Sequence, residues 1–485
     1  MPLPAPPLVP AAPASAPGPG LASRRIALLA SVLGSFLTPF MISAVNVSLP
    51  AIGEDLQLDA VLLNWVPTAF LLASSIFLLP SGRLADRWGR KRVYVAGIAL
   101  FTVSSLLLGL VRGAAGLIGL RAVQGMACGQ IFSTGAAILA SVFPPGERGR
   151  ALGINVAAVY FGLSAGPFLG GLITFHVGWR SIFLAPVPFG VATLLLIWWG
   201  LPQEWRDPGP PPPFDLVGTL LYALGLLQLV GSLPALPAAR GWGLLAGGAA
   251  TLAAFVAWEA RHAAPLLPVD LFLTNRVFAF ANLASTIHYA ATYANSFLLS
   301  LFLQQTQGLD PRQAGALLVV QPLFQAVCSP LAGWLSDRRD PRLLASAGMG
   351  LTGLGLLLLS GCTAATSREW LGGVLAMMGV GFALFSSPNI NCVMGSVEPQ
   401  HYGLASGVQS TMRVLGQMAS MAVTMLLFSL MIGTTRIEAG QLPAFQAVFR
   451  LAYRIFFALC CLGVVASLAR GPARPAAPAA GDRIA

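Results

Sequence analysis

The stretch "GRLADRWGRKR" at residues 82–92 decides the fold, because it concentrates charge between two long apolar runs. Six of its eleven residues are charged, in a chain of 485 residues that is only 9% charged. The run "VLLNWVPTAFLLASSIFLLPS" (61–81) precedes it, and "VYVAGIALFTVSSLLLGLV" (93–111) follows it. A helix that crosses a bilayer needs about 20 mostly apolar residues. The stretch is therefore predicted to be a loop between two membrane spans.

The composition of the whole chain indicates a polytopic membrane protein. Hydrophobic residues make up 56% of it, and a soluble chain would carry about 25% charged residues. The net charge of +11 does not favour a nucleic-acid partner, because the basic residues are scattered between apolar runs without a basic helix. Six cysteines form no C-x-x-C pair, so neither a metal site nor a disulfide framework is expected.

Apolar segments long enough to span the membrane recur along the chain. The first 21 residues, rich in proline and alanine, are instead predicted to be a disordered tail. The predicted spans lie near residues 26–49, 60–81, 93–111, 115–142, 151–175, 181–200, 215–236, 242–259, 277–303, 312–335, 343–362, 370–394, 403–432 and 446–469. Pro234 and Pro237 make the boundary between the seventh and eighth spans the weakest of these predictions.

The distribution of basic residues predicts the orientation of the spans. With the N-terminus inside, 18 basic residues fall on the cytoplasmic side and six in outer loops. Cytoplasmic loops carry the excess of lysine and arginine in membrane proteins. Both termini are therefore predicted to be cytoplasmic, with the loop 82–92 on the same side.

The pattern G-x-L-x-D-R occurs twice, as "GRLADR" from Gly82 and "GWLSDR" from Gly333. Each copy ends an even-numbered span and opens a cytoplasmic loop, which indicates a duplicated helix bundle. The copies are eight spans apart rather than six, so two extra spans lie between the halves. The predicted regions are a tail at 1–21, a six-helix bundle at 22–203, a linker with two extra spans at 204–275, a second six-helix bundle at 276–470 and a cytoplasmic tail at 471–485.

Several further segments carry recognisable patterns: "VNVSLP" (45–50), "LIGLRAVQGMACG" (117–129), "GLSAGPFLGG" (162–171) and "LASGVQSTMRVLGQ" (404–417). Together with the loop 82–92, they resemble the motifs of the major facilitator superfamily, specifically its fourteen-span drug/proton antiporters of the EmrB/QacA type. The resemblance implies an all-α polytopic membrane protein with the major facilitator fold: two six-helix bundles plus two extra central spans, working by alternating access.

The charged loop is expected to take part in gating, because the positive-inside rule explains its arginines but neither Asp86 nor Gly82. Gly82 is expected to permit a tight exit from the second span, and Asp86 with the arginines to form a charge cluster that holds the halves in one conformation. The alternative is a solvated loop that only sets orientation. The predicted gating residues are Gly82, Asp86, Arg87, Gly89, Arg90, Asp337 and Arg338.

In the fifth span, glycines recur every four residues on one helix face. This spacing lets helix backbones approach closely, and a proline inside the helix can bend it. Tight packing alone is the alternative to a role in antiport, which enters only through the resemblance. The residues of this motif are Gly162, Gly166, Pro167, Gly170 and Gly171.

Two ionisable side chains inside spans, Arg121 and His288, are candidates for coupling transport to an ion gradient. A charge inside a membrane is costly and faces the interior or a wet cavity, and histidine changes charge near physiological pH. A neutral His288 bonded to a neighbouring helix is the alternative. None of the 17 acidic residues lies deep in a span. Members of the resembling family carry an aspartate where this chain has Met41, which leaves the coupling ion open.

The substrate cavity is expected to be lined mainly by apolar, aromatic and amide groups, which suit a lipophilic molecule. Each of these residues can equally be packing. The candidates are Phe36, Phe40, Met41, Asn46, Gln124, Tyr289, Tyr293, Asn295, Gln321, Gln325, Asn389, Asn391 and Arg413.

These observations predict a secondary active transporter of the inner membrane that exports lipophilic small molecules and is driven by protons. No Walker-type loop or H-E-x-x-H occurs, so an enzyme, a cofactor and an ATP site are not expected. A monomer is expected. A facilitator or importer of a metabolite on the same fold is the alternative, and a receptor or channel would not explain the duplicated loop.

Overall fold

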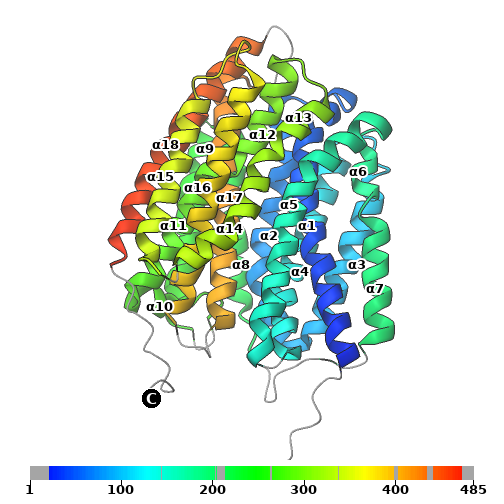
Figure 1. The fold of residues 1–485 in the computed structure, drawn as a ribbon, viewed down its shortest axis with the longest axis vertical. Helices are drawn as coiled ribbons and strands as arrows, with labels where there is room; N and C mark the ends of the chain where they lie inside the picture. Colours follow the sequence, from blue (N-terminus) through cyan, green and yellow to red (C-terminus); the bar gives the residue numbers. More distant parts are fainter. Residues whose placement is uncertain are drawn as a thin grey trace, which may run out of the picture.

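The computed structural model describes residues 21–143, 145–201, 204, 213–236, 238–262, 265–336, 338–397, 402–433 and 441–471. All regular structure in these residues is helical (Figure 1). Residues 1–20 of the tail predicted at 1–21, most of the proline-rich linker and the segment after Gly471 lie outside the described residues, whereas Leu21, the last residue of the predicted tail, is helical. The helices are α1 (Leu21–Asp55), α2 (Ala60–Trp88), α3 (Arg90–Leu108), α4 (Ala114–Val142), α5 (Pro145–Val177), α6 (Arg180–Leu184), α7 (Val187–Gly200), α8 (Leu216–Ser232), η1 (Leu233–Ala235), α9 (Ala239–Glu259), α10 (Val269–Thr274), α11 (Arg276–Thr292), α12 (Ala294–Leu301), η2 (Phe302–Thr306), α13 (Pro311–Leu318), α14 (Val320–Ser336), α15 (Pro341–Leu359), α16 (Arg368–Gly395), α17 (Tyr402–Met431) and α18 (Leu442–Ala469).

Thirteen helical segments in the described residues are long and apolar enough to cross a membrane, so the chain is a multi-pass membrane protein. The span predicted at 277–303 is present as α11 and α12, neither of which is long enough alone. The break falls at Tyr293, and the Ala294 N–H donates to the Ser420 hydroxyl at 3.0 Å. A side chain that takes a backbone donor out of the helical ladder is a common cause of such a break.

The helices form two bundles that lie side by side (Figure 1). In the first, α1 packs against α5 and α2 against α4; in the second, α14 and α15 pack against α16, and α11 against α17. The start of α1 and the end of α18 lie at the same end of the molecule, which we call the terminal face (lower end in Figure 1). The opposite end is the distal face. The bundles meet through α2 with α17, α5 with α13 and α1 with α12.

Helices α8 and α9 lie in the region for which the two extra spans are predicted. The two helices pack on each other, and α8 also contacts α2. Asp215 joins them, because its carboxylate accepts from the Gly218 N–H at the start of α8 and from Trp258 Nε1 on α9, at 2.8 and 3.1 Å. This one residue therefore caps a helix and fixes its neighbour.

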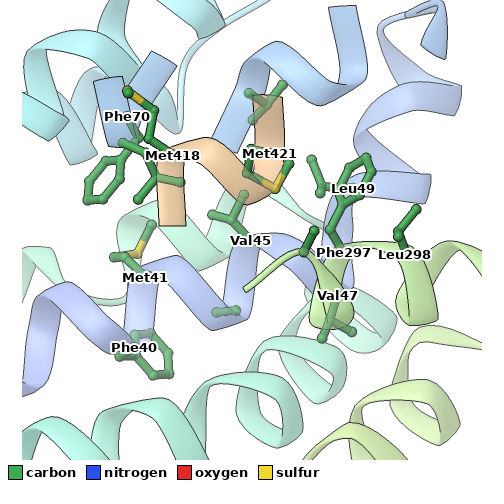
Figure 2. Packing of buried hydrophobic residues seen from close by; sticks show 14 of the residues in the cluster. Phe40, Met41, Val45, Val47, Leu49, Phe70, Phe297, Leu298, Met418 and Met421 are labelled. Atoms are coloured by element: carbon green, nitrogen blue, oxygen red, sulfur yellow. The ribbon is translucent and has the colours of Figure 1, made fainter. Parts of the chain in front are cut away.

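An apolar cluster packs across part of the interface between the bundles. Figure 2 shows residues of α1 and α2, among them Met41 and Phe70, beside Phe297 of α12 and Met418 of α17. Met41 is 0% exposed. The position at which the resembling family carries an aspartate is thus filled by a side chain that belongs to this core.

Candidate functional site

A cavity of about 1050 Å³ lies between the two bundles. Helices α1, α2, α4 and α5 line it on one side, and α11, α14, α16 and α17 on the other. Its wall includes Arg83, Asp86 and Met394 near the terminal face and reaches inward to Asn46 and Leu318, but it includes none of the described residues at the distal ends of the helices. The cavity therefore extends from the terminal face and ends inside the molecule.

Sequence patterns predicted many of the polar residues in this wall. The predicted residues found there are Asn46, Tyr289, Tyr293, Asn295, Gln321, Gln325 and Arg413. The structure places Phe40 and Met41 in the packed core instead. Gln124 is buried and donates to the Ser105 hydroxyl at 2.7 Å. Asn389 is likewise buried, bonded to the Ala281 carbonyl at 3.1 Å.

Helix α17 presents a polar stripe to the cavity. Gln409, Arg413 and Gln417 line the wall four residues apart, the spacing that puts side chains on one helix face. The Arg413 guanidinium lies 5.6 Å from the centre of the Phe132 ring on α4 and beside the Tyr289 hydroxyl of α11. A cation over an aromatic face is stabilised by the ring quadrupole.

Several wall residues were not predicted from the sequence. Tyr160 of α5 and Ser386 of α16 join their hydroxyls at 2.9 Å across the cavity, and Phe132 and Phe382 supply aromatic surface. Hydropathy could not identify them, because the lipid-facing and the inward-facing sides of these helices are both apolar. The hydroxyl of Tyr160 in an apolar run was the one available signal.

Arg121 lies in the interior of the first bundle, 1% exposed. Its Nε donates to the Val66 carbonyl at 3.2 Å and its Nη1 to Gln124 Oε1 at 2.5 Å, and its guanidinium lies 4.3 Å from the centre of the Phe70 ring. All of these partners are neutral. The charge is thus held by dipoles and a π face rather than by a carboxylate.

His288 is 0% exposed and lies outside the cavity wall, although its neighbour Tyr289 is part of it. Its ring centre is 4.0 Å from that of Phe385 and 4.7 Å from that of Phe382. Within the described residues, neither ring nitrogen has a hydrogen-bond partner. The interhelical hydrogen bond considered from the sequence is therefore not among its described contacts.

The glycine motif of α5 forms two separate contacts. A Cβ added at Gly162 or Gly170 would collide with the backbone of α1, and one at Gly166 with the Ser43 hydroxyl of the same helix. Close approach of α1 and α5 thus requires glycine at these three positions.

Gly171 instead faces the other bundle. A Cβ there would meet the Pro311 carbonyl at the start of α13, and a Cβ at Gly315 of α13 would meet the Pro167 carbonyl of α5. Nearby, Gln304 Nε2 donates to the Val47 carbonyl of α1 at 2.8 Å. We call the contact of Gly171 and Pro167 with Pro311 and Gly315 the distal seam. It closes the interface between the cavity and the distal face.

The charged loop forms a tight corner at the terminal face, and one expectation for it is wrong. Gly82 lies inside α2, which continues to Trp88, so it is no exit from the span. The chain turns at Gly89, with φ +107°, where a Cβ would also collide with Glu204. The helix runs on past Gly82 because the six residues that follow it include neither proline nor glycine, the residues that most disfavour a helix.

The charges of this corner hold several helices together. Asp86 pairs with Arg90 at 3.8 Å, and Arg90 also bonds the Ser141 hydroxyl of α4. Glu204 accepts from the Lys91 N–H at 2.8 Å, which places a carboxylate at the positive end of α3. Of the other predicted gating residues, Arg87 is exposed, Arg338 covers the Trp334 ring at 3.9 Å and Asp337 lies outside the described residues.

Comparison with known proteins identifies the family. The sequence profile of the Major Facilitator Superfamily matches residues 31–280 and 281–484. The cephamycin export protein CmcT of Amycolatopsis lactamdurans is 34% identical over 82% of this chain and 83% of its own length. The multidrug resistance protein Stp of Mycobacterium tuberculosis is 32% identical over 83% of this chain and 75% of its own. The riboflavin transporter RibZ of Clostridioides difficile is 28% identical over 91% of this chain and 96% of its own. The chain, with its two helical bundles around an interior cavity, belongs to the Major Facilitator Superfamily of membrane transporters.

Proposed function

We propose that this transporter exports lipophilic small molecules from the cytoplasm by alternating access, driven by the proton gradient. The observation that carries the proposal is the cavity between the bundles, which extends from the terminal face and is closed by the distal seam. In transporters of this kind, one bundle rocks against the other around a central site. The basic residues favour a cytoplasmic terminal face, so the cavity would load from inside the cell.

The fourteen-span subtype, a monomer and an inner-membrane location belong to the same proposal. Segment α11–α12 would supply the fourteenth crossing, and α8 with α9 would be the extra pair between bundles at 22–203 and 276–470. Relatives named as an exporter of cephamycin and a multidrug resistance protein support export.

Everted membrane vesicles test direction and coupling together. Vesicles that contain the protein should accumulate a lipophilic fluorescent substrate when energised, and an uncoupler should abolish the accumulation. A drug-susceptibility panel in a host that lacks its own exporters would identify which compounds are exported. Accumulation only in right-side-out vesicles would contradict export.

Import or facilitated passage of a metabolite is the second candidate, because a relative of similar length is named as a riboflavin transporter. Uptake of labelled riboflavin by whole cells, with and without expression of the chain, separates this candidate from export.

We propose Arg121 and His288 as coupling residues, since no acidic residue lies deep in a span. His288 would have to become reachable by water in another conformation, because its ring is enclosed by Phe382 and Phe385 here. The substitution His288→Gln should uncouple export from the pH gradient and leave substrate binding measurable. Equal substrate-induced proton release from purified wild-type and variant protein would exclude His288.

A further inference from the structure

We propose that the cavity recognises lipophilic acids, with Arg413 as the residue that binds their anionic group. This inference concerns the substrate class of the exporter proposed above and rests on that proposal only for the direction of transport.

Most charges in the described cavity wall are positive. Among the described residues, the wall contains three arginines and one aspartate. Arg83, Asp86 and Arg90 lie at the terminal face, where Asp86 and Arg90 pair and Arg83 bonds the Pro265 carbonyl. Arg413 lies eleven residues into α17, about 16 Å along the helix, and is the one charged wall residue described at that depth.

Arg413 has no carboxylate partner in the described part of the chain. Its described contacts are the Phe132 ring and the Tyr289 hydroxyl, both neutral. Within the ranges that the structure describes, no acidic residue lies in the middle of a span. A guanidinium inside a membrane needs a partner, and its planar donor pairs match carboxylates and other oxyanions.

A second positive charge adds to the field of the cavity. Arg121 is enclosed by neutral groups and lies close enough to Tyr293, a wall residue, to interact with its hydroxyl. Two guanidiniums and no deep acid disfavour an organic cation in this site and favour an anion. The aromatic groups near Arg413, namely Phe132, Tyr160, Tyr289 and Phe382, fit a flat apolar body attached to the anionic group.

Binding of three pyrene compounds that differ only in charge tests this inference. Fluorescence titration of the purified protein would compare pyrenebutyric acid, its methyl ester and a pyrene alkylamine at neutral pH. Wild-type protein should bind the acid at least about tenfold more tightly than the ester, as expected for a charge-assisted bidentate hydrogen bond. The amine should bind most weakly.

Variants assign the preference to Arg413. Arg413→Gln should weaken acid binding about tenfold and change ester binding by less than about twofold, and Arg413→Lys should keep part of the preference. The matched control is Arg454→Gln, since Arg454 is exposed on α18 and absent from the cavity wall. It should leave both affinities unchanged.

The outcomes separate this inference from the proposed function. No preference for the acid in the wild type, or a preference that survives in Arg413→Gln, would overturn it even if everted vesicles show export. If Arg413→Gln does not fold, Arg413→Lys and the wild-type ranking of acid, ester and amine still decide. An Arg413-dependent preference without accumulation in vesicles would support the inference and contradict export.

Discussion

At the scale of single residues, the buried guanidinium of Arg121 is stabilised by neutral partners. Arg121 has a carbonyl, an amide and an aromatic ring around it. Gln124 is central, because its oxygen accepts from Arg121 and its nitrogen donates to Ser105. The amide thus fixes the orientation of the guanidinium, and its loss would leave a buried donor unpaired.

Replacement of this amide by an apolar side chain should therefore destabilise the protein. For Gln124→Leu we expect a loss of about 1–3 kcal/mol, the cost of an unsatisfied buried donor, measured as a lower Tm in detergent. Gln130→Leu on the same helix is the control, because the Gln130 side-chain oxygen is already buried without a partner among the described residues. Equal Tm shifts for the two variants would show that Gln124 does not support Arg121.

At the scale of helices, glycines permit close backbone contacts both within one bundle and between the two bundles. The three glycines that face α1 hold α5 within its own bundle, whereas Gly171 and Gly315 bring α5 and α13 of different bundles into backbone contact. A side chain in the distal seam would have to push the bundles apart, because the atoms it meets are carbonyl oxygens that cannot rotate away.

Gly171→Val should consequently shift the protein toward a state that is open at the distal face. His176 and Arg312, both exposed near the seam, would be replaced by cysteines that carry spin labels, in a background without the six native cysteines. Double electron–electron resonance should then give a longer distance between the two labels. Gly119→Val on α4 is the matched control, since a Cβ there meets no atom within 4 Å. An unchanged distance distribution in Gly171→Val would show that the distal seam tolerates the side chain.

The sequence was most informative where hydropathy or repetition carries the signal. Long apolar runs predicted the membrane helices, and the amides Asn295, Gln321 and Gln325, predicted to line the cavity, lie in its wall. The rotation of each helix was not predictable, since both lipid and protein core select apolar side chains. Phe40 and Phe132 illustrate this limit: one was assigned to the cavity and lies in the core, and the other lines the cavity.

At the scale of the whole molecule, the cavity and the distal seam make the two ends unequal. The terminal face carries the charged corner around Asp86 and Gly89, and it is the face from which the cavity extends. The predicted orientation, with this face in the cytoplasm, decides whether the present conformation would take up substrate from inside the cell or from outside.

Single cysteines on each face would establish the orientation. A membrane-impermeant maleimide added to intact cells should label a cysteine at Arg312, which is exposed at the distal end of α13, and spare one at Trp88, which is exposed at the terminal end of α2. Both should react after permeabilisation, which controls for the reactivity of each site. If only the cysteine at position 88 is labelled in intact cells, the topology is the opposite of the predicted one.

The position of α8 and α9 has a practical consequence for imaging. Neither helix contributes a described residue to the cavity wall, and Trp242 and Trp258 of α9 are exposed. Two bundles of equal helix number look nearly alike in projection along the membrane normal, which hinders particle alignment in electron cryomicroscopy. The pair α8 and α9, packed beside α2, breaks that likeness, so the halves of this small protein should be distinguishable in class averages without a bound antibody fragment.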